Sequence, residues 1–278
     1  MSTDLWFTET SHDIRASWRV RDVLYHKASR FQDILVVDTV RFGKMLVLGG
    51  CVMTTERDEF VYHEMLTHPA MLAHPAPRSV CVVGGGDGGT VREVLRHSTV
   101  EHVVLAEIDD EVVDVCREFF PALAVELQDP RVELAIGDGA QYLKDHPGSF
   151  DVILSDSTDP IGPGVVLFED DYFQSAKNAL RDGGVFVTQC EGMWIDVQTA
   201  RSVTERLKRF FKTVLPYVAS IPTYPSGTWG FVFAADGIDP RAQVDSKRQQ
   251  EIASKMRYYT AAHQAGAFAV PAFFHNQD

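Results

Sequence analysis

The sequence lacks the usual marks of secreted, membrane and metal-binding proteins. It has only four cysteines in 278 residues, and no two of them form a CxxC pair: Cys51, Cys81, Cys116 and Cys190. Each lies in an apolar stretch, which is typical of small core residues in a reducing compartment and predicts neither a disulfide nor a zinc site. No apolar run approaches the roughly 20 residues of a membrane span, and the polar N-terminal stretch has no apolar signal core. We therefore expect a cytoplasmic protein with no membrane association and no metal.

Basic residues are also scarce. The chain has 26 Lys and Arg against 39 Asp and Glu, which gives a formal net charge of −13. This balance disfavours binding to nucleic acid and is compatible with cationic partners, although a solvated acidic surface is the more ordinary explanation. A hydrophobic content of 45% is enough to bury a large core, as expected for one large domain with a small appendage.

The N-terminal part has the pattern of β-hairpins. Short β-like runs, VRDVLYH, ILVVD and KMLVLGG, lie between residue 18 and about residue 55. The stretch TTERDEFVYHEML then changes to helical spacing, with Thr55 as the expected N-cap and Asp58 as its capping-box partner. We therefore predict an N-terminal β-strand domain over residues 1–55 and a catalytic domain over residues 56–278.

From Ser79 onward, strand-like and helix-like segments alternate. The strand-like segments SVCVVGG, HVVLAEID, VELAIGDG and FDVILSD are separated by helical patterns, and VFVTQC follows a helix that ends at RDGG. Such alternation predicts βαβ units around a parallel sheet. Two final β-rich runs without a helix between them predict an antiparallel hairpin at one edge. The expected fold is an α/β, Rossmann-like class I methyltransferase fold with a mostly parallel, seven-stranded sheet, preceded by a small antiparallel β domain.

Acidic residues follow the predicted parallel strands. Because ligands of such sheets bind at the carboxyl ends of the strands, we expect these acids to line one rim: Asp87, Glu107, Asp109, Asp138, Asp156 and Asp159. The loop GGGDGG satisfies GxGxxG through Gly84, Gly86 and Gly89, a weak signal alone. Glu107 follows it at the spacing of an acid that binds ribose hydroxyls, which favours an adenosine-type ligand.

Asp87 discriminates between ligands of that type. A carboxylate about 4 Å from a pyrophosphate would repel it by several kcal/mol at an effective dielectric near 20. It would attract a cationic group on the adenosine by the same amount. A dinucleotide is therefore disfavoured, and a sulfonium or ammonium is favoured.

A second acidic pair points to a diamine. Asp156 and Asp159 lie in the loop of FDVILSDSTDPIGPG, where prolines and glycines prevent a helix, so both carboxylates can face the rim. Asx-turn capping is the alternative explanation for Asp159. Aromatic residues could wall an apolar slot between the acids, which would fit an aliphatic diamine: Tyr62, His63, Trp194, Tyr224 and Trp229.

With these residues in view, the chain resembles the polyamine aminopropyltransferases. The matching stretches include TERDEFVYHEM, VVGGGDGGTVREV, EIDDEVV, GDGAQYL, FDVILSDSTDPIGP, IPTYPSG and RYYTAAHQAGAFAVP, in the expected order over most of the chain. The resemblance implies homodimers or homotetramers and no tightly bound cofactor. It also implies transfer of an aminopropyl group from decarboxylated S-adenosylmethionine, the co-substrate, to putrescine.

The resemblance also implies roles for individual residues. Contacts to the donor are expected from Gln32, Gly85, Gly86, Asp87, Glu107, Asp138, Gly139 and Pro163. Asp87 is expected to pair with the donor's ammonium, and Asp156 to act as the catalytic acid-base residue with help from Tyr62. The diamine is expected to contact His63, Asp87, Asp156, Asp159, Gln189 and Tyr224.

Three positions depart from the pattern of this family. Gly49 stands in LGG where many members have LDG, Met53 stands where they have glutamine, and His263 lies one place early, which leaves Gln264 at the expected position. These changes bear on the acceptor, and cadaverine, agmatine and spermidine stay open beside putrescine. A putrescine N-methyltransferase, a nicotinamide-dependent oxidoreductase and a non-enzymatic polyamine-binding protein are the competing hypotheses.

Overall fold

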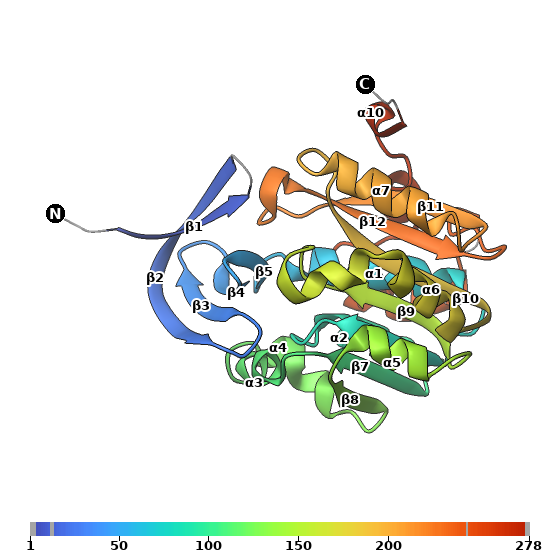
Figure 1. Cartoon of the computed structure of the whole chain (residues 1–278), viewed down its shortest axis with the longest axis horizontal. Coiled ribbons are helices and arrows are strands. Elements are labelled where there is room, and N and C mark those ends of the chain that lie inside the picture. Colours follow the sequence, from blue (N-terminus) through green and yellow to red (C-terminus); the bar gives the residue numbers. More distant parts are fainter. Residues whose placement is uncertain (1–3, 12–13, 243, 276–278) are drawn as a thin grey trace.

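The computed structural model describes residues 4–11, 14–242 and 244–275. Two sheets build the molecule, and the smaller one lies beside the carboxyl ends of the strands of the larger one (Figure 1). None of the helices within these ranges is long and apolar enough to cross a membrane.

The smaller sheet is antiparallel and comes from the N-terminal part of the chain. Its five strands follow sequence order: β1 (Leu5–Ser11), β2 (Ile14–Ala28), β3 (Asp33–Thr39), β4 (Gly43–Leu48) and β5 (Cys51–Thr55). The sequence analysis predicts the hairpins of β2 to β4 but not β1. Trp18, Val37 and Met45 pack together on one face of this sheet, as alternating strand side chains allow.

The larger sheet has seven strands in the order β11-β12-β10-β9-β6-β7-β8. The bounds of these strands are β6 (Ser79–Gly84), β7 (His102–Glu107), β8 (Val132–Ile136), β9 (Phe150–Asp156), β10 (Leu180–Gly192), β11 (Thr213–Ser220) and β12 (Thr228–Ala235). Strands β8, β7, β6, β9 and β10 are parallel, whereas β12 pairs antiparallel with both β10 and β11. This confirms the predicted fold, including the antiparallel hairpin at one edge.

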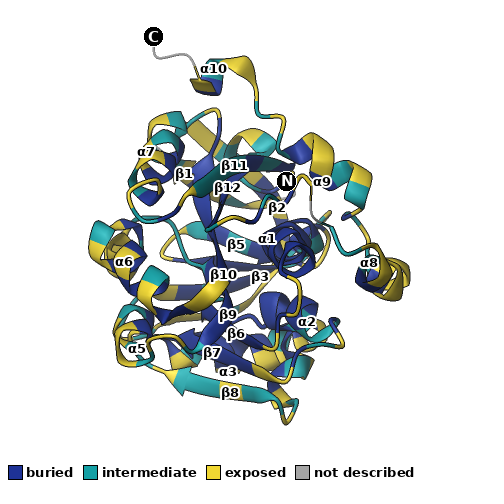
Figure 2. Cartoon of the chain, turned by 90° about the vertical axis from the view of Figure 1, so that its right-hand side faces the viewer, coloured by how far each residue is buried: buried dark blue, intermediate teal, exposed yellow. Residues whose placement is uncertain are grey.

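Helices cover both faces of this sheet (Figure 2). One face carries α1 (Glu59–Ala73), α2 (Gly89–Leu95), α3 (Asp110–Phe119), α4 (Pro121–Ala124), and α8 (Ser246–Ile252) with α9 (Ala261–Ala267) from the C-terminal segment. The other carries α5 (Gly139–Asp145), α6 (Asp170–Ala179) and α7 (Val197–Leu207), and the short α10 (Ala272–His275) lies near α7. Val80 and Val82 belong to the first hydrophobic layer and Cys81 and Val83 to the second, because alternate strand residues face opposite sides.

Helix α1 is unusual because every residue except Phe60 is buried. A helix that is buried all round is normally apolar. This one nevertheless carries Glu59, His63, Glu64 and His68. Each of these buried polar side chains must therefore find a partner inside the protein.

Several local predictions are wrong. The predicted N-cap Thr55 lies at the end of β5, and α1 begins only at Glu59. The Thr55 hydroxyl instead donates to the Asp58 carboxylate at 2.6 Å, and that carboxylate also holds Thr223 through its backbone N–H and its hydroxyl. Asp58 therefore ties three segments together rather than completing a capping box.

Two further predictions need correction. RDGG does end α6, but it lies within β10, whose register shifts between Leu180 and Val185. All four cysteines are free thiols, and Cys51 is only half-buried instead of lying in the core. The division into domains at residue 55 stays a prediction; β5 ends there, and α1 follows after a three-residue turn.

Candidate active site

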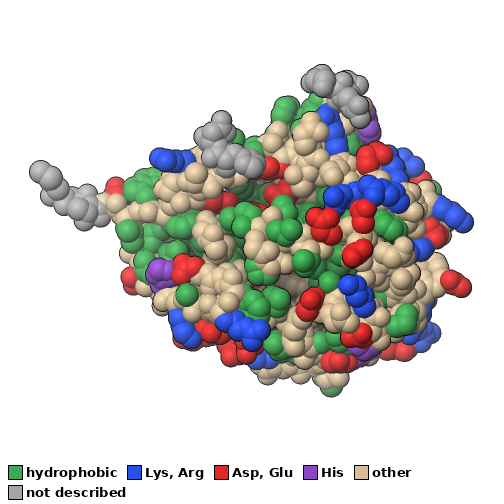
Figure 3. All heavy atoms as spheres, viewed as in Figure 1, with side chains coloured by type: hydrophobic (Ala, Val, Ile, Leu, Met, Phe, Trp, Pro, Cys, Tyr) green, Lys and Arg blue, Asp and Glu red, His purple; other side chains and the backbone are tan. Residues whose placement is uncertain are grey.

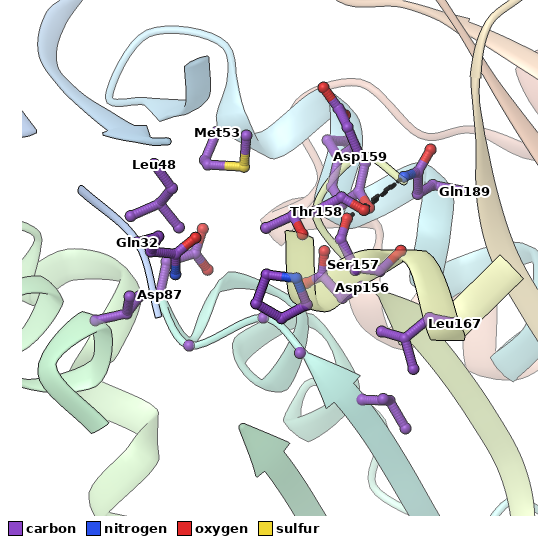
Figure 4. A pocket seen from close by; sticks show the side chains of 18 of the residues that line it. Gln32, Leu48, Met53, Asp87, Asp156, Ser157, Thr158, Asp159, Leu167 and Gln189 are labelled. Atoms are coloured by element: carbon purple, nitrogen blue, oxygen red, sulfur yellow. Dashed lines mark hydrogen bonds between the residues drawn. The ribbon is translucent and has the colours of Figure 1, made fainter. Parts of the chain in front are cut away.

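A cavity of about 350 Å³ opens where the two sheets meet. Figure 4 shows Leu48 and Met53 of the small sheet opposite Asp156 at the end of β9. Every residue to which the resemblance assigns a role lines this cavity: Gln32, Tyr62, His63, Gly85, Gly86, Asp87, Glu107, Asp138, Gly139, Asp156, Asp159, Pro163, Gln189 and Tyr224. Their roles stay predictions.

The glycine loop gives the acidic side chains the space they need. Gly84 and Gly85 have φ values of 76° and 74°, which only glycine adopts without strain. A Cβ on Gly84 would lie 2.2 Å from the Asp156 carbonyl oxygen, and one on Gly85 would lie 2.5 Å from Asp156 Oδ2. The loop therefore accommodates the backbone and the carboxylate of Asp156.

Glu107 lies at the opposite side of the same loop. Its Oε2 accepts a hydrogen bond from the Gly86 N–H at 3.0 Å, and its Oε1 accepts one from the Asp109 N–H at 2.9 Å. Burial nevertheless raises the pKa of Glu107 to about 7. Hydroxyl donors from a bound ribose would stabilise the ionised carboxylate further.

Asp109 and Asp138 differ in their surroundings. The expectation that Asp109 lines the rim with the other acids is wrong: its Oδ2 accepts hydrogen bonds from Ser29 Oγ at 2.6 Å and Gln32 Nε2 at 3.2 Å. Asp109 thereby fixes the small sheet against the large one. Asp138 lines the cavity and also caps α5, where it accepts hydrogen bonds from the Ala140 and Gln141 N–H groups.

Asp87 belongs to a buried chain of charges. Its Oδ1 accepts a hydrogen bond from the Gly89 N–H at 2.7 Å, and its Oδ2 lies 3.4 Å from Nε2 of His63. The other ring nitrogen of His63, Nδ1, lies 2.7 Å from Glu59 Oε2, and Arg92 binds Glu59 with both terminal nitrogens. Both nitrogens of His63 thus face carboxylates before any diamine binds.

Asp156 lies in the middle of the cavity. Its Oδ2 accepts a hydrogen bond from the Thr90 hydroxyl at 2.6 Å, and both Thr90 and the Tyr62 hydroxyl lower the pKa of Asp156. Burial raises the pKa of Asp156 to about 6, although His63 opposes this rise. Burial and the Asp156 charge together raise the pKa of Tyr62 well above its usual value. Asp156 can therefore accept a proton at neutral pH, while Tyr62 stays a hydrogen-bond donor.

More carboxyl groups gather at the far end of the cavity. Glu9, Asp159, Glu191 and Asp196 line it there, and burial raises the pKa of Asp159 although Glu191 and the Cys51 thiol oppose the rise. Burial, with help from Asp159, raises the pKa of Glu191 to about 9, and burial raises that of Glu9 to about 7. We call these four residues the distal acids; with a pKa of about 9, Glu191 is protonated at neutral pH.

Gln189 and the loop after β9 frame the distal acids. Gln189 Nε2 donates to the Thr158 carbonyl at 3.3 Å (Figure 4), and its Oε1 accepts from the Glu191 N–H at 2.8 Å. Sequence reasoning missed Glu9, Glu191 and Asp196. Glu191 lies near the carboxyl end of β10, so the strand-end rule that identified Asp156 could have found it, whereas no local pattern marks Glu9.

Apolar and aromatic side chains form the wall between the two acidic ends. Tyr62 and Tyr224 meet edge to face with their centroids 5.9 Å apart, and Trp229 packs against Tyr224 at 4.5 Å. The Tyr224 hydroxyl donates to the Met53 carbonyl at 2.6 Å. The prediction for Trp194 is wrong: its side chain is 62% exposed and packs on Phe273, away from the cavity lining.

The departures noted in the tail also have a structural setting. Gln264 is buried, with its Oε1 bound by the Tyr259 hydroxyl and its Nε2 bound to the Pro240 carbonyl at 2.7 Å. His263 packs edge to face on Tyr258. Neither residue lines the cavity. Across the described part of the chain, no cluster of three or more His, Cys, Asp or Glu could hold a metal ion.

Comparisons with known proteins agree with this geometry. Residues 59–246 match the model of the spermine/spermidine synthase domain, and residues 5–56 match that of the spermidine synthase tetramerisation domain. A polyamine aminopropyltransferase of Thermoanaerobacter sp. (strain X514) is 42% identical over 97% of both chains. A spermidine synthase of Dictyostelium discoideum is also 42% identical, over 96% of this chain and 95% of its own.

Solved structures of spermidine synthases also resemble this chain. A spermidine synthase crystallised with the transition state analogue AdoDATO superposes with a TM-score of 0.95 at 36% identity, covering 98% of this chain and 94% of that one. The spermidine synthase from Thermotoga maritima superposes with a TM-score of 0.93 at 36% identity, covering 98% of this chain and 93% of that one. The chain therefore belongs to the spermine/spermidine synthase family of polyamine aminopropyltransferases, and it is a transferase.

Proposed function

We propose that this enzyme is a spermidine synthase, which transfers the aminopropyl group of decarboxylated S-adenosylmethionine to putrescine and releases 5′-methylthioadenosine. The observation that carries the proposal is the cavity's charge pattern: Asp87 at one end, Asp156 in the middle and the distal acids at the other end. That pattern matches a cationic donor and a cationic acceptor that meet at Asp156. The relative crystallised with AdoDATO supports the donor.

The donor would occupy the end of the cavity formed by the glycine loop. Glu107 would accept hydrogen bonds from the ribose, with Asp138, Gly139, Gln32 and the backbone of the glycine loop around the nucleoside. Asp87 would pair with the ammonium of the aminopropyl group. Ordinary S-adenosylmethionine carries a carboxylate at this point, which Asp87 would repel.

The diamine would lie along the aromatic wall, with one nitrogen near Asp156 and the other at the distal acids. The ammonium nearest Asp156 must lose a proton, which costs roughly 4 to 5 kcal/mol at pH 7 for a lysine-like amine. The nearby sulfonium lowers that cost by depressing the pKa of the amine, and Asp156 accepts the proton with Tyr62 as its hydrogen-bond donor.

The transfer itself is an in-line displacement. The nitrogen lone pair forms the new C–N bond while the electrons of the C–S bond pass to sulfur. The sulfonium becomes a neutral thioether, and the new secondary amine takes the positive charge. Because no bond to the protein forms, the cavity contributes mainly by holding nitrogen, carbon and sulfur in line.

Product analysis tests the proposal directly. The enzyme is incubated with decarboxylated or ordinary S-adenosylmethionine and with putrescine, cadaverine, agmatine or spermidine, and the products are identified by mass spectrometry. We expect spermidine and 5′-methylthioadenosine from the decarboxylated donor with putrescine. Methylputrescine from the ordinary donor would assign an N-methyltransferase instead, and diamine binding without any product would assign a binding protein.

We also propose that the enzyme forms a homotetramer or homodimer through its N-terminal sheet. The match of residues 5–56 to a tetramerisation domain supports this. So do the exposed apolar side chains of that sheet, Leu5, Trp6, Ile14, Val23 and Leu24, where Figure 3 shows hydrophobic atoms at the surface. Light scattering after size-exclusion chromatography tests it, and a monomer at micromolar concentration would contradict it.

A further inference from the structure

The chain of charges behind Asp87 extends far beyond the cavity. From Glu59 it continues through Arg92 to Glu93, whose Oε1 lies 2.9 Å from Arg92 Nη2. Glu93 Oε2 then contacts Arg96 at 2.8 Å and His68 at 3.2 Å. Helices α1 and α2 thus share a row of alternating charges, and the end of that row nearest the cavity is His63.

His63 is the residue whose protonation this geometry decides. Its Nδ1 lies 2.7 Å from Glu59 and its Nε2 lies 3.4 Å from Asp87. A neutral imidazole has only one N–H and would present a lone pair to one of these two carboxylates. Only the imidazolium can donate to both, so the two carboxylates require the charged form.

The groups around His63 come from several elements. Glu59 and Tyr62 lie on α1, Asp87 lies in the glycine loop, and Asp156 lies at the end of β9. Burial alone would lower the pKa of His63, but Asp87 and Glu59 outweigh burial and raise that pKa well above its usual value. His63 and Arg92 in turn lower the pKa of Glu59 to about 2 against the effect of burial.

Gly89 provides the space for the imidazole ring. A Cβ at Gly89 would lie 2.2 Å from His63 Cε1 and 2.4 Å from Nδ1. Gly89 has no positive φ, so its backbone conformation is open to any residue. The last glycine of the loop is therefore required by contact with the ring of His63.

We propose that Glu59 is a positioning residue, which keeps His63 as a permanent imidazolium so that the imidazolium holds the Asp87 side chain directed at the donor. The part concerning the donor rests on the proposed function, whereas the charge of His63 does not. Glu59 itself touches neither substrate, because it does not line the cavity. Its effect reaches the donor through His63 and Asp87.

A titration of the parent protein tests the charge of His63 without any substrate. Histidine labelled with ¹⁵N in the ring gives the protonation of each imidazole by NMR, and His63→Gln assigns the signal. We expect His63 to stay doubly protonated up to at least about pH 8, while the exposed His102 serves as the internal reference. Loss of the His63 proton near pH 6.5, the ordinary histidine value, would overturn the proposal.

Glu59→Gln then tests the positioning role. This variant keeps the shape of the side chain and removes its charge. We expect the KM for the decarboxylated donor to rise at least about tenfold at pH 8 and much less at pH 6, where His63 regains its proton. Glu93→Gln is the matched control, because Glu93 also binds Arg92 but does not touch His63; its donor KM should stay independent of pH.

The outcomes separate the two proposals. A donor KM in Glu59→Gln that shows no added dependence on pH would overturn the positioning role while the parent still makes spermidine. If Glu59→Gln fails to fold, the titration of the parent protein decides the matter alone. Absence of spermidine from the parent enzyme would instead contradict the proposed function and leave the charge of His63 to the NMR result.

Discussion

The two acidic ends of the cavity contain similar residues but differ in how their charge is compensated. Behind Asp87, carboxylates alternate with His63, Arg92 and Arg96, so each anion has a cation of the protein beside it. Within the described residues, no lysine or arginine lines the cavity, and among the distal acids burial raises the pKa values of Glu9, Asp159 and Glu191.

This difference indicates what each end is built to do. A compensated carboxylate such as Asp87 already has a cationic partner within the protein, which holds its position whether or not a ligand is present. Buried carboxyl groups with raised pKa values, such as Glu191, cost folding free energy when they ionise, and a bound cation would offset that cost. The first end is organised in advance, and the second depends on the ligand.

Asp156 lies between the two ends, and its loss should have the largest effect. We expect Asp156→Asn to lower kcat by about 10²- to 10⁴-fold, the usual contribution of an acid-base residue, because the amide cannot accept the proton. Affinity for the donor should change little. Single-turnover kinetics and calorimetry with the decarboxylated donor measure the two effects, and near-normal turnover would remove Asp156 from this role.

Asp87→Asn tests how much the charge at the compensated end of the cavity contributes to donor binding. The side chain keeps its size but loses the charge that, under the proposed function, attracts the donor's ammonium. We expect affinity for decarboxylated S-adenosylmethionine to fall about 10- to 100-fold, as for loss of a hydrogen bond to a charged group. Affinity for ordinary S-adenosylmethionine, the matched ligand, should change little or increase; equal losses for the two ligands in calorimetry would contradict the assignment.

Gly89→Ala tests the packing of His63 at the Asp87 end of the cavity. Alanine favours a helix over glycine by about 1 kcal/mol, yet its Cβ would collide with His63. We expect lower thermal stability and an increase in donor KM of about tenfold. Gly266→Ala is the matched control, since no atom lies within 4 Å of a Cβ at that site in α9; it should be neutral or stabilising. Equal behaviour of the two variants would refute the contact.

Glu191→Gln tests how the distal acids affect the stability of the protein. The carboxyl has a pKa of about 9 in the folded protein and about 4.5 normally, so the folded state binds more protons between these values. Stability of the empty enzyme therefore falls as pH rises through this window. In the variant, the free energy of unfolding should fall less steeply with pH. At pH 8 it should be about 1 kcal/mol higher than in the parent protein, as measured by urea unfolding at several pH values.

The corresponding result with ligand provides the check. Putrescine should stabilise the parent enzyme more at pH 8 than at pH 6, because the ligand supplies the missing cation. Glu191→Gln should show a smaller difference between the two pH values. If both proteins respond equally, the distal acids are not the site of the second ammonium.

The sequence predicted the ends of the parallel strands well, because the acids there follow buried apolar runs in a fixed topology. Asp156 and Glu107 could be placed in this way. Contacts between distant segments could not be predicted: nothing near Glu9 indicates that β1 reaches Asp159, and Asp109 satisfies the strand-end rule yet turns toward Ser29. The prediction for Trp194 was wrong for the same reason, since its ring packs against Phe273 in the C-terminal segment.

The hydrogen bond from Tyr224 to the Met53 carbonyl joins the last hairpin to the small sheet. The large sheet supplies Asp87 and Asp156 to the cavity, while the small sheet supplies Met53, Val52 and Glu9; under the proposed function these three residues would lie along the path of the acceptor. Selection can therefore act on β1 and β5 to change the length or charge of the accepted amine. The donor loop and its chemistry would be inherited unchanged.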